Sequence, residues 1–587
     1  VLFQFSMHTP PSSKRLRGFR RSGIFRRESK DGCTCSPVPI ASPRAENRQG
    51  LSGNGHASRY WKGGYMKKTL KPYIIWFTLF LSSAAAPPAV FSSSADVNLY
   101  VNGEYRGGIT SAFIEEHSYK LRFRGPYSSG ISLLEVLPLF LDVYRIEVDF
   151  EGRAAAAGDT GSADVPRNSR SEILRGGNLA DRFGQWYLTF GGGAVHLLTE
   201  DRTYGELSSI KIWGEEIPGD ELTVWIGWEG ITELKEEFAR FEKLTGITLN
   251  IQEVPSIDSK LSSVARGGGP VPDLVMIQSD YLPELTKSGI LQKLDYMVPE
   301  HILEKGIAAF IREGGHWGIP FYFDTQLVFY NPELVQKAPP LDWDLEEFEA
   351  VLQDLRSLGI APITWNAYSA YWFIPFQLGF GKESILESDN SITVDDPPTQ
   401  KALRYIIDLT ERGLLDIRER EGMMSRFLTG GVAMILSGSY SIPEFEKLGV
   451  PFAVAPYPFN RKTRKPVSPL LDFKAFGITK RTRNPVLARR VIEYLTGIGV
   501  QQRFTAAVSK LPANTEAWSI IEGENPYYDT LYKSYRAGTV IPPANSYKIY
   551  KNTMWKLLRF ALTGQLTAEE TLRKGQEIID NKLKARR

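Results

Sequence analysis

The chain contains 587 residues, of which 42% are hydrophobic and 23% are charged, an ordinary composition for a folded protein that excludes a disordered or collagen-like chain. At roughly 150 residues per domain, several hydrophobic cores are expected. The net charge of +3 is uneven: residues 1–65 carry +9 and residues 66–95 carry +3, so residues 96–587 carry −9. Because this larger part is acidic, it has no reason to bind nucleic-acid phosphates.

The first part of the chain has the composition of a targeting region. Residues 1–65 are rich in Arg, Ser, Gly and Pro without periodicity, and we interpret them as a disordered basic segment or a mis-called gene start. Residues 66–95 combine lysines, the apolar run Pro72–Leu81 and a small-residue tail, which are the three parts of a secretory signal peptide. The run is shorter than the ~20 residues that span a bilayer, which disfavours a permanent membrane helix.

The two cysteines, Cys33 and Cys35, both precede that apolar run. From residue 36 onward the chain therefore has no disulfide, thiolate metal site or thiol nucleophile. The usual lipid anchor of bacterial lipoproteins, which requires a cysteine after the signal peptide, is also excluded. We expect a secreted protein of the periplasm, without a lipid anchor.

Residues 96–218 alternate short apolar runs with turns, as in VNLYVNG, YRIEVDFEG and IKIWGEE. Alternation with a period of two residues, bounded by glycines, predicts β-strands. We therefore expect a small β-rich domain, to which the sequence assigns no role.

From about residue 219 the pattern changes to strands that alternate with amphipathic helices. ELTVWIG predicts a buried strand, and the next helix has apolar residues at Leu234, Phe238 and Phe241 before Gly246. Ser279 or Asp280 is placed to cap a following helix, and Asp344 with Glu347 predicts a capping box. This alternation predicts an α/β fold, long enough for two lobes; no internal repeat is evident.

Motifs of the common catalytic and metal sites are missing from the sequence. There is no G-x-S-x-G, no H-E-x-x-H and no G-x-x-x-x-G-K-[ST]. The histidines after the signal peptide are widely separated and lack the spacing of metal ligands. We therefore expect neither an enzyme nor a cofactor.

Five segments in chain order resemble a known family. Residues 220–587 are similar to the extracellular solute-binding proteins of ABC importers, in the sugar-binding group typified by maltose-binding protein. The matching segments are ELTVWIGWEGITELKEEFARFEKLTGITLNI, PDLVMIQSDYLPELTKSGILQKLD, HWGIPFYFDTQLVFYNPELV, SRFLTGGVAMILSGSY and ALTGQLTAEETL.

The resemblance implies a two-lobed periplasmic-binding-protein fold of type II with crossover hinge strands. It places one lobe at 219–323 and 475–518 and the other at 324–474 and 519–587. It also implies that a monomer captures a sugar or oligosaccharide between the lobes and delivers it to a membrane permease. Open α/β sheets bind ligands beyond the carboxyl ends of their strands, which agrees with a site between two facing sheets.

Sugars require aromatic faces for their C–H surfaces and carboxylates for their hydroxyl groups. Such residues occur at ten positions of the matching region, and most of them match the family's pocket. Asp472 instead stands where the family often has glycines, and Tyr547 or Tyr550 would substitute for a family tryptophan. For several of the ten positions the sequence leaves a structural role open. Asp280 is alternatively a helix cap, Asp324 and Asp472 are alternatively hinge groups, and Trp365 is alternatively a core residue. Lys551 departs from the family, which has a tryptophan there. The predicted ligand-binding residues are Trp228, Glu229, Asp280, Tyr322, Asp324, Trp365, Tyr371, Tyr440, Asp472 and Tyr547.

The sequence also allows a second function, ligand sensing or adhesion. The same fold serves ligand sensing or adhesion, in which the β-rich domain would dock a partner. The sequence does not identify the sugar or decide between import and sensing.

Overall fold

The structure is a computed structural model that describes residues 96–585 apart from 122–128, 137–140, 152–154, 157–168, 176–185, 200–201, 295–298 and the single positions 218, 220, 229, 300, 388 and 524. The expected basic segment and signal peptide, residues 1–95, lie outside the described residues, and so does Glu229. Among the helices in the described ranges, none has the length and apolar character needed to cross a membrane.

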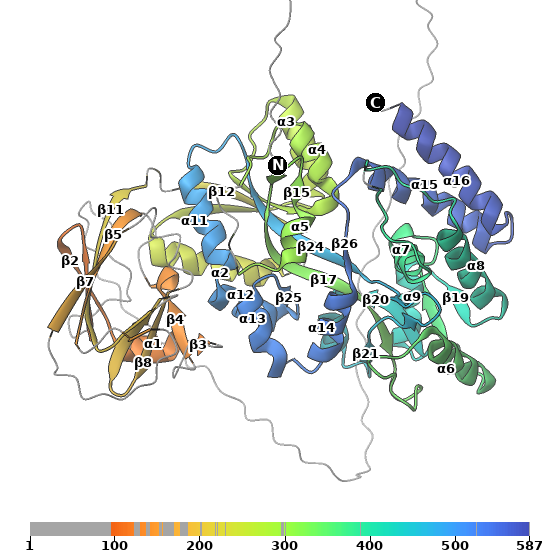
Figure 1. The fold of residues 1–587 in the computed structure, drawn as a ribbon, viewed down its shortest axis with the longest axis horizontal. Coiled ribbons are helices and arrows are strands. Elements are labelled where there is room, and N and C mark those ends of the chain that lie inside the picture. Colours follow the sequence, from red (N-terminus) through yellow and green to blue (C-terminus); the bar gives the residue numbers. More distant parts are fainter. Residues whose placement is uncertain are drawn as a thin grey trace, which may run out of the picture. The chain divides into compact units, whose positions relative to one another are not determined.

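Residues 97–216 form two antiparallel-rich sheets, called the N-terminal module below (Figure 1). One sheet has the order β2-β1-β11-β5-β7 and the other β3-β4-β8-β9-β10-β6. Phe150 and Tyr204 come from different sheets and their rings lie 5.2 Å apart, so the sheets share a core. The strands are β1 Val97–Val101, β2 Glu104–Ile109, β3 Tyr119–Lys120, β4 Ser129–Ser132, β5 Leu141–Glu151, β6 Ala155–Ala156, β7 Ser169–Arg175, β8 Tyr187–Gly191, β9 Ala194–Leu198, β10 Arg202–Tyr204 and β11 Leu207–Glu216; helix α1 is Ser111–His117.

The rest of the chain is built on a sheet of the order β13-β12-β14-β24-β17-β20-β18-β19. At one end, β12 pairs in parallel with β13 and β14; at the other, β18 pairs in parallel with β19 and β20. Each end is therefore a small parallel sheet of an α/β lobe, as the sequence predicts. The strands are β12 Glu221–Ile226, β13 Thr248–Glu253, β14 Leu274–Gln278, β17 Ile319–Tyr330, β18 Ile363–Trp365, β19 Leu415–Ile417, β20 Met434–Gly438, β21 Ala453–Ala455, β24 Leu470–Ile478, β25 Leu511–Pro512 and β26 Thr539–Val540.

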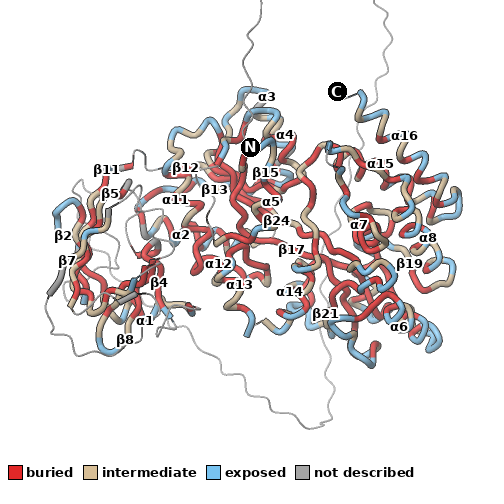
Figure 2. Tube along the Cα trace, in the orientation of Figure 1, coloured by how far each residue is buried: buried red, intermediate tan, exposed pale blue. Residues whose placement is uncertain are grey.

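Three antiparallel or short strands join the two ends of this sheet. The first half of β17 pairs with β24, and its second half, Gln326–Tyr330, pairs with β20. In turn β24 pairs with β14 at one end and with β26 at the other. All twelve residues of β17 are buried, and Figure 2 shows β17 and β24 within the buried interior. We call β17, β24 and β26 the crossing strands.

Helices flank both ends of the sheet, and their termini agree with several local predictions. Helix α2 buries Phe238 and Phe241 and ends at Gly246, whose φ of 74° suits glycine. The capping box of Asp344 and Glu347 is confirmed at the start of α6. The other helices are α2 Ile231–Thr245, α3 Ile257–Gly267, α4 Leu282–Lys287, α5 Glu304–Ala309, α6 Leu345–Ser357, α7 Ala370–Gly379, α8 Pro397–Glu411, α9 Arg420–Leu428, α10 Ile442–Leu448, α11 Pro485–Thr496, α12 Ile498–Val508, α13 Thr515–Ile520, α14 Tyr528–Ala537, α15 Asn545–Leu562 and α16 Ala568–Lys584.

One cap prediction is wrong. Ser279 and Asp280 do not cap α4, because they belong to a 3-10 turn, Ser279–Tyr281, and the helix begins only at Leu282. Neither this turn nor α4 has a side-chain cap hydrogen bond. The two side chains make long-range contacts instead, Ser279 with Ile541 and Asp280 with Lys551.

The N-terminal module contacts the α/β part through a partly buried arginine on α12. Arg503 forms ion pairs with Glu135 of the module at 2.9 Å and with Glu237 of α2 at 2.8 Å. Both glutamate side chains are only 7% exposed, so the arginine compensates two desolvated charges. The helix also approaches the module closely at Gly499, where an added Cβ would clash with Glu135 and Tyr119.

Arg503→Ala is expected to lower the free energy of unfolding by about 3 kcal/mol, because it leaves two buried carboxylates without their cation. Urea denaturation followed by tryptophan fluorescence measures this loss. Arg573→Ala, at an exposed position of α16, is the control. A loss for Arg503→Ala within about 1 kcal/mol of this control would contradict the assignment.

Candidate functional site at the strand crossings

Polar and aromatic side chains gather where the parallel strands of both lobes end. Asp280 lies in the turn that follows β14, and Tyr440 lies in a 3-10 turn, Ser439–Ser441, that follows β20. Trp228 follows β12, has a φ of 65° and lines a cavity of about 340 Å³ together with Tyr281. This is the edge at which open α/β sheets bind ligands.

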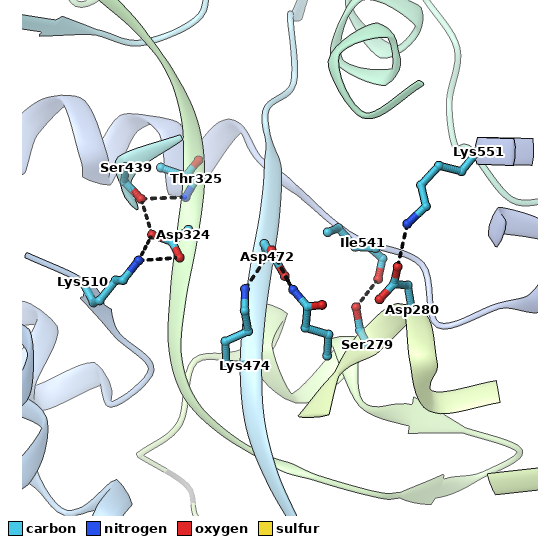
Figure 3. Close-up of polar contacts among 11 residues, drawn as sticks. Ser279, Asp280, Asp324, Thr325, Ser439, Asp472, Lys474, Lys510, Ile541 and Lys551 are labelled. Carbon is cyan, nitrogen blue, oxygen red and sulfur yellow. Dashed lines mark hydrogen bonds and ion pairs between the residues drawn. The ribbon is translucent and has the colours of Figure 1, made fainter. Parts of the chain in front are cut away.

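Asp324 lies on β17 and is 2% exposed. Its two carboxylate oxygens each accept a hydrogen bond from Lys510 Nζ at 3.0 Å, and Oδ1 also accepts one from Ser439 Oγ at 2.9 Å (Figure 3). Lys510 is itself only 1% exposed. The structure thus gives Asp324 the hinge hydrogen bonds that the sequence left open as the alternative to ligand contact.

Asp472 lies on the neighbouring crossing strand, β24. It forms an ion pair with Lys474 at 2.8 Å and accepts hydrogen bonds from Gln278 Nε2 at 3.1 and 3.2 Å. Burial raises the pKa of Asp472; Lys474 opposes this effect, and Asp324 and Asp280 add to it. The three carboxylates therefore lie close enough to influence each other.

Asp280, in the turn after β14, contacts the distant helix α15. Its Oδ2 accepts a hydrogen bond from Lys551 Nζ of α15 at 3.0 Å, and Figure 3 shows this pair beside the bond from Ser279 to Ile541. Lys551 is the residue at which the sequence departs from the family tryptophan. A cation therefore stands here where the resemblance predicts an aromatic ring, and it compensates Asp280.

Three tyrosines complete the group of side chains. Burial raises the pKa of Tyr371 well above its ordinary value, and Tyr440, Asp472, Tyr547 and Asp324 raise it further. Lys551 Nζ lies 5.6 Å from the ring centroid of Tyr547, and Arg420 lies 5.3 Å from that of Tyr440. The structure therefore brings Tyr371, Tyr440 and Tyr547 together with the three aspartates.

Three of the predicted aromatic residues are packed in the interior. Tyr547 of α15 is 1% exposed. Trp365 is 0% exposed, and its ring stacks on Phe376 with centroids 5.8 Å apart, so it occupies the core position that the sequence left open. Tyr322 is also 0% exposed, and Lys474 and Lys510 lie 5.9 and 5.6 Å from its ring centroid. Tyr322 is thus next to the lysines of the site and lies on the same face of β17 as Asp324.

The predicted set lacks the lysines of the site. Lys474 was accessible to reasoning from the sequence, because it lies two residues after Asp472 on one strand and must share its face. Lys510 precedes β25 and had no such signal, since it lies 186 positions from Asp324. Its role depends on a contact that only the folded chain creates.

Lys510→Met is expected to lower the free energy of unfolding by about 3 to 5 kcal/mol, because Asp324 then remains buried without a cation. Adding Asp324→Asn should recover part of the loss, since the uncompensated charge disappears. Urea denaturation of both variants measures this, with Lys574→Met at an exposed position of α16 as the control. Equal stability of Lys510→Met and the control would show that the pair is not buried as described.

Comparisons with known proteins agree with the arrangement of lobes and crossing strands. Residues 237–523 match the family described as bacterial extracellular solute-binding protein. A maltodextrin-binding protein of Bacillus subtilis is 24% identical over 319 residues, which are 52% of this chain and 76% of the relative. A maltooligosaccharide ABC transporter solute-binding lipoprotein of Streptococcus pneumoniae is 23% identical over 389 residues, covering 62% of this chain and 89% of the relative.

Solved structures show the same fold. The GacH receptor of Streptomyces glaucescens aligns with a TM-score of 0.56 at 21% identity, and a maltose/maltodextrin-binding domain of Bdellovibrio bacteriovorus with 0.53 at 22%. Each alignment covers 62% of this chain and 99% or 100% of the other. The two-lobed fold and the resemblance of residues 220–587 to the sugar-binding group of extracellular solute-binding proteins are therefore confirmed.

Proposed function

We propose that this chain is an extracellular or periplasmic solute-binding protein that captures a sugar or oligosaccharide between its two lobes and delivers it to an ABC transporter permease. It acts as a monomer, without a cofactor, and releases the ligand chemically unchanged. One observation carries the proposal: Asp280, Asp472 and three tyrosines from both lobes converge at β17 and β24. Gln278 bonds to Asp472, Lys551 lies against both Asp280 and the Tyr547 ring, and residues on β17 or bonded to it contact Tyr371 and Tyr440.

The balance of charge at the site supports a neutral ligand. Each aspartate is paired with a lysine: Asp324 with Lys510, Asp472 with Lys474 and Asp280 with Lys551. A ligand with a full charge would meet no unbalanced counter-charge in this group, whereas a sugar needs none. The hydroxyls of Tyr371 and Tyr440 are protonated at neutral pH, as those of ordinary tyrosines are, and burial raises the pKa of both further, so they act as donors and acceptors.

The proposed ligand contacts are divided between the lobes. Asp280 and Trp228 approach from the β12–β14 side, and Tyr371, Tyr440 and Tyr547 approach from the β18–β20 side. The bond from Lys551 uses Oδ2 of Asp280, and Oδ1 is proposed to accept from a sugar hydroxyl. Because both sides contact one ligand, binding favours the closed arrangement, a state that a permease can recognise.

The names of the relatives favour import over sensing or adhesion. Those relatives are binding proteins of maltodextrin and maltooligosaccharide, and one is described as part of an ABC transporter. A maltooligosaccharide is therefore the first ligand to test. We also propose that residues 219–323 with 475–518 form one lobe and residues 324–474 with 519–587 the other.

A saturating sugar from a panel that includes maltotriose is expected to raise the melting temperature of the wild type. At a concentration of 100 Kd the stabilisation amounts to about 2.7 kcal/mol. The double variant Tyr371→Ala/Tyr440→Ala should lose this response, because it removes the stacking surfaces of one lobe. Tyr144→Ala, at a tyrosine that is 53% exposed on β5, should retain it. A sugar-induced shift that survives in the double variant would remove this pocket assignment.

Asp280→Asn is expected to weaken sugar binding about tenfold, because a charge-assisted hydrogen bond becomes a neutral one. Isothermal titration calorimetry measures the affinity, with Asp354→Asn at an exposed position of α6 as the matched control. An unchanged affinity for Asp280→Asn would place the carboxylate outside the ligand contacts.

A further inference from the structure

Two turns at the site have matching sequences and matching structures. SDYLPEL, at Ser279–Leu285, and SYSIPEF, at Ser439–Phe445, share serine, proline and glutamate at the same three positions. Each begins with a three-residue 3-10 turn directly after the strand, β14 or β20, and continues into a short helix with proline in its first turn. The two segments are therefore equivalent elements of the two lobes.

The first serine of each turn is buried, and its hydroxyl bonds to a crossing strand or to the residue that directly follows one. Ser279 is 1% exposed, and its Oγ donates to the backbone oxygen of Ile541, directly after β26, at 2.9 Å. Ser439 is 0% exposed; its Oγ donates to Asp324 at 2.9 Å and accepts from the backbone N–H of Thr325 at 3.1 Å. Figure 3 shows both sets of contacts.

These bonds are not the usual function of a serine before a helix. A serine in that place commonly caps the helix by accepting from its backbone N–H groups. Neither turn has a side-chain cap hydrogen bond, and both hydroxyls are directed to segments far away in the sequence. At both equivalent positions, the turn therefore lacks the stabilisation that a side-chain cap would give.

The residue after each serine is a proposed ligand contact. Asp280 follows Ser279 in one lobe, and Tyr440 follows Ser439 in the other. Gly438, before the second turn, leaves room for the Tyr440 ring, because an added Cβ would clash with that ring. The place of each contact side chain therefore depends on the placement of its turn.

We infer that Ser279 and Ser439 are equivalent positioning residues, which fix one ligand contact of each lobe, Asp280 or Tyr440, to the segments that cross between the lobes. The inference rests on the proposed function. The serines do not touch the ligand, since both are buried against the crossing segments. Their hydroxyls hold Asp280 and Tyr440 at the separation that one ligand bridges.

Double-mutant cycles test this role with maltotriose as the first probe and the other sugars of the panel after it. Ser439→Ala should weaken binding about five- to tenfold in the wild type but less than twofold in a Tyr440→Leu background. Ser279→Ala should behave in the same way towards Asp280→Asn. Isothermal titration calorimetry gives the affinities, and amide exchange at Thr325 reports the loss of its acceptor in Ser439→Ala without any ligand.

The same turn provides a matched control. Ser441 is equally buried, but its hydroxyl bonds to Ser437 at 2.7 Å within one lobe. Ser441→Ala should lower the melting temperature yet leave the affinity within twofold. A wild type that binds no sugar of the panel overturns the proposed function and this role with it. A wild type that binds, with Ser439→Ala and Ser441→Ala weakening the affinity equally, overturns the positioning role alone.

Discussion

The arrangement of the site depends on one buried ion pair, between Asp324 and Lys510. Both side chains are removed from water, so each would be strongly unfavourable without the other. The pair is satisfied only when β17, the segment before β25 and the turn after β20 meet, because Ser439 supplies the third hydrogen bond. The ion pair therefore matters because it fixes these three segments relative to one another. A buried ion pair contributes little net stability compared with apolar packing.

The remaining charges of the site follow the same pattern. Asp472 and Asp280 are each compensated by a lysine. The tyrosines around them are neutral at physiological pH, and burial raises their pKa further. A group of compensated carboxylates and neutral hydroxyls offers many hydrogen bonds but no net charge. Such a surface suits a neutral, polyhydroxylated ligand, and Lys551 achieves this balance at the position where the family has an aromatic residue.

The N-terminal module is joined to the half of the molecule that contains β12–β14. Arg503 links Glu135 of the module to α2, and Gln502 of the same helix donates to the backbone of Lys120. Tyr187 of the module donates to Glu516 on α13. The turn that carries Tyr440 bonds instead to β17, through Ser439.

The sequence by itself determined the alternation of strands and helices, the capping box at Asp344 and the family resemblance, because these depend on periodicity and on residues close together in the chain. It also selected Asp280, Asp472, Tyr371, Tyr440 and Tyr547, which the folded chain brings together. Only the tertiary structure decided that Trp365 is a core residue, that Asp324 is bonded within the hinge and that Ser279 does not cap α4. The last two depend on partners far away in the sequence, Lys510 and Ile541, whose proximity no local pattern encodes.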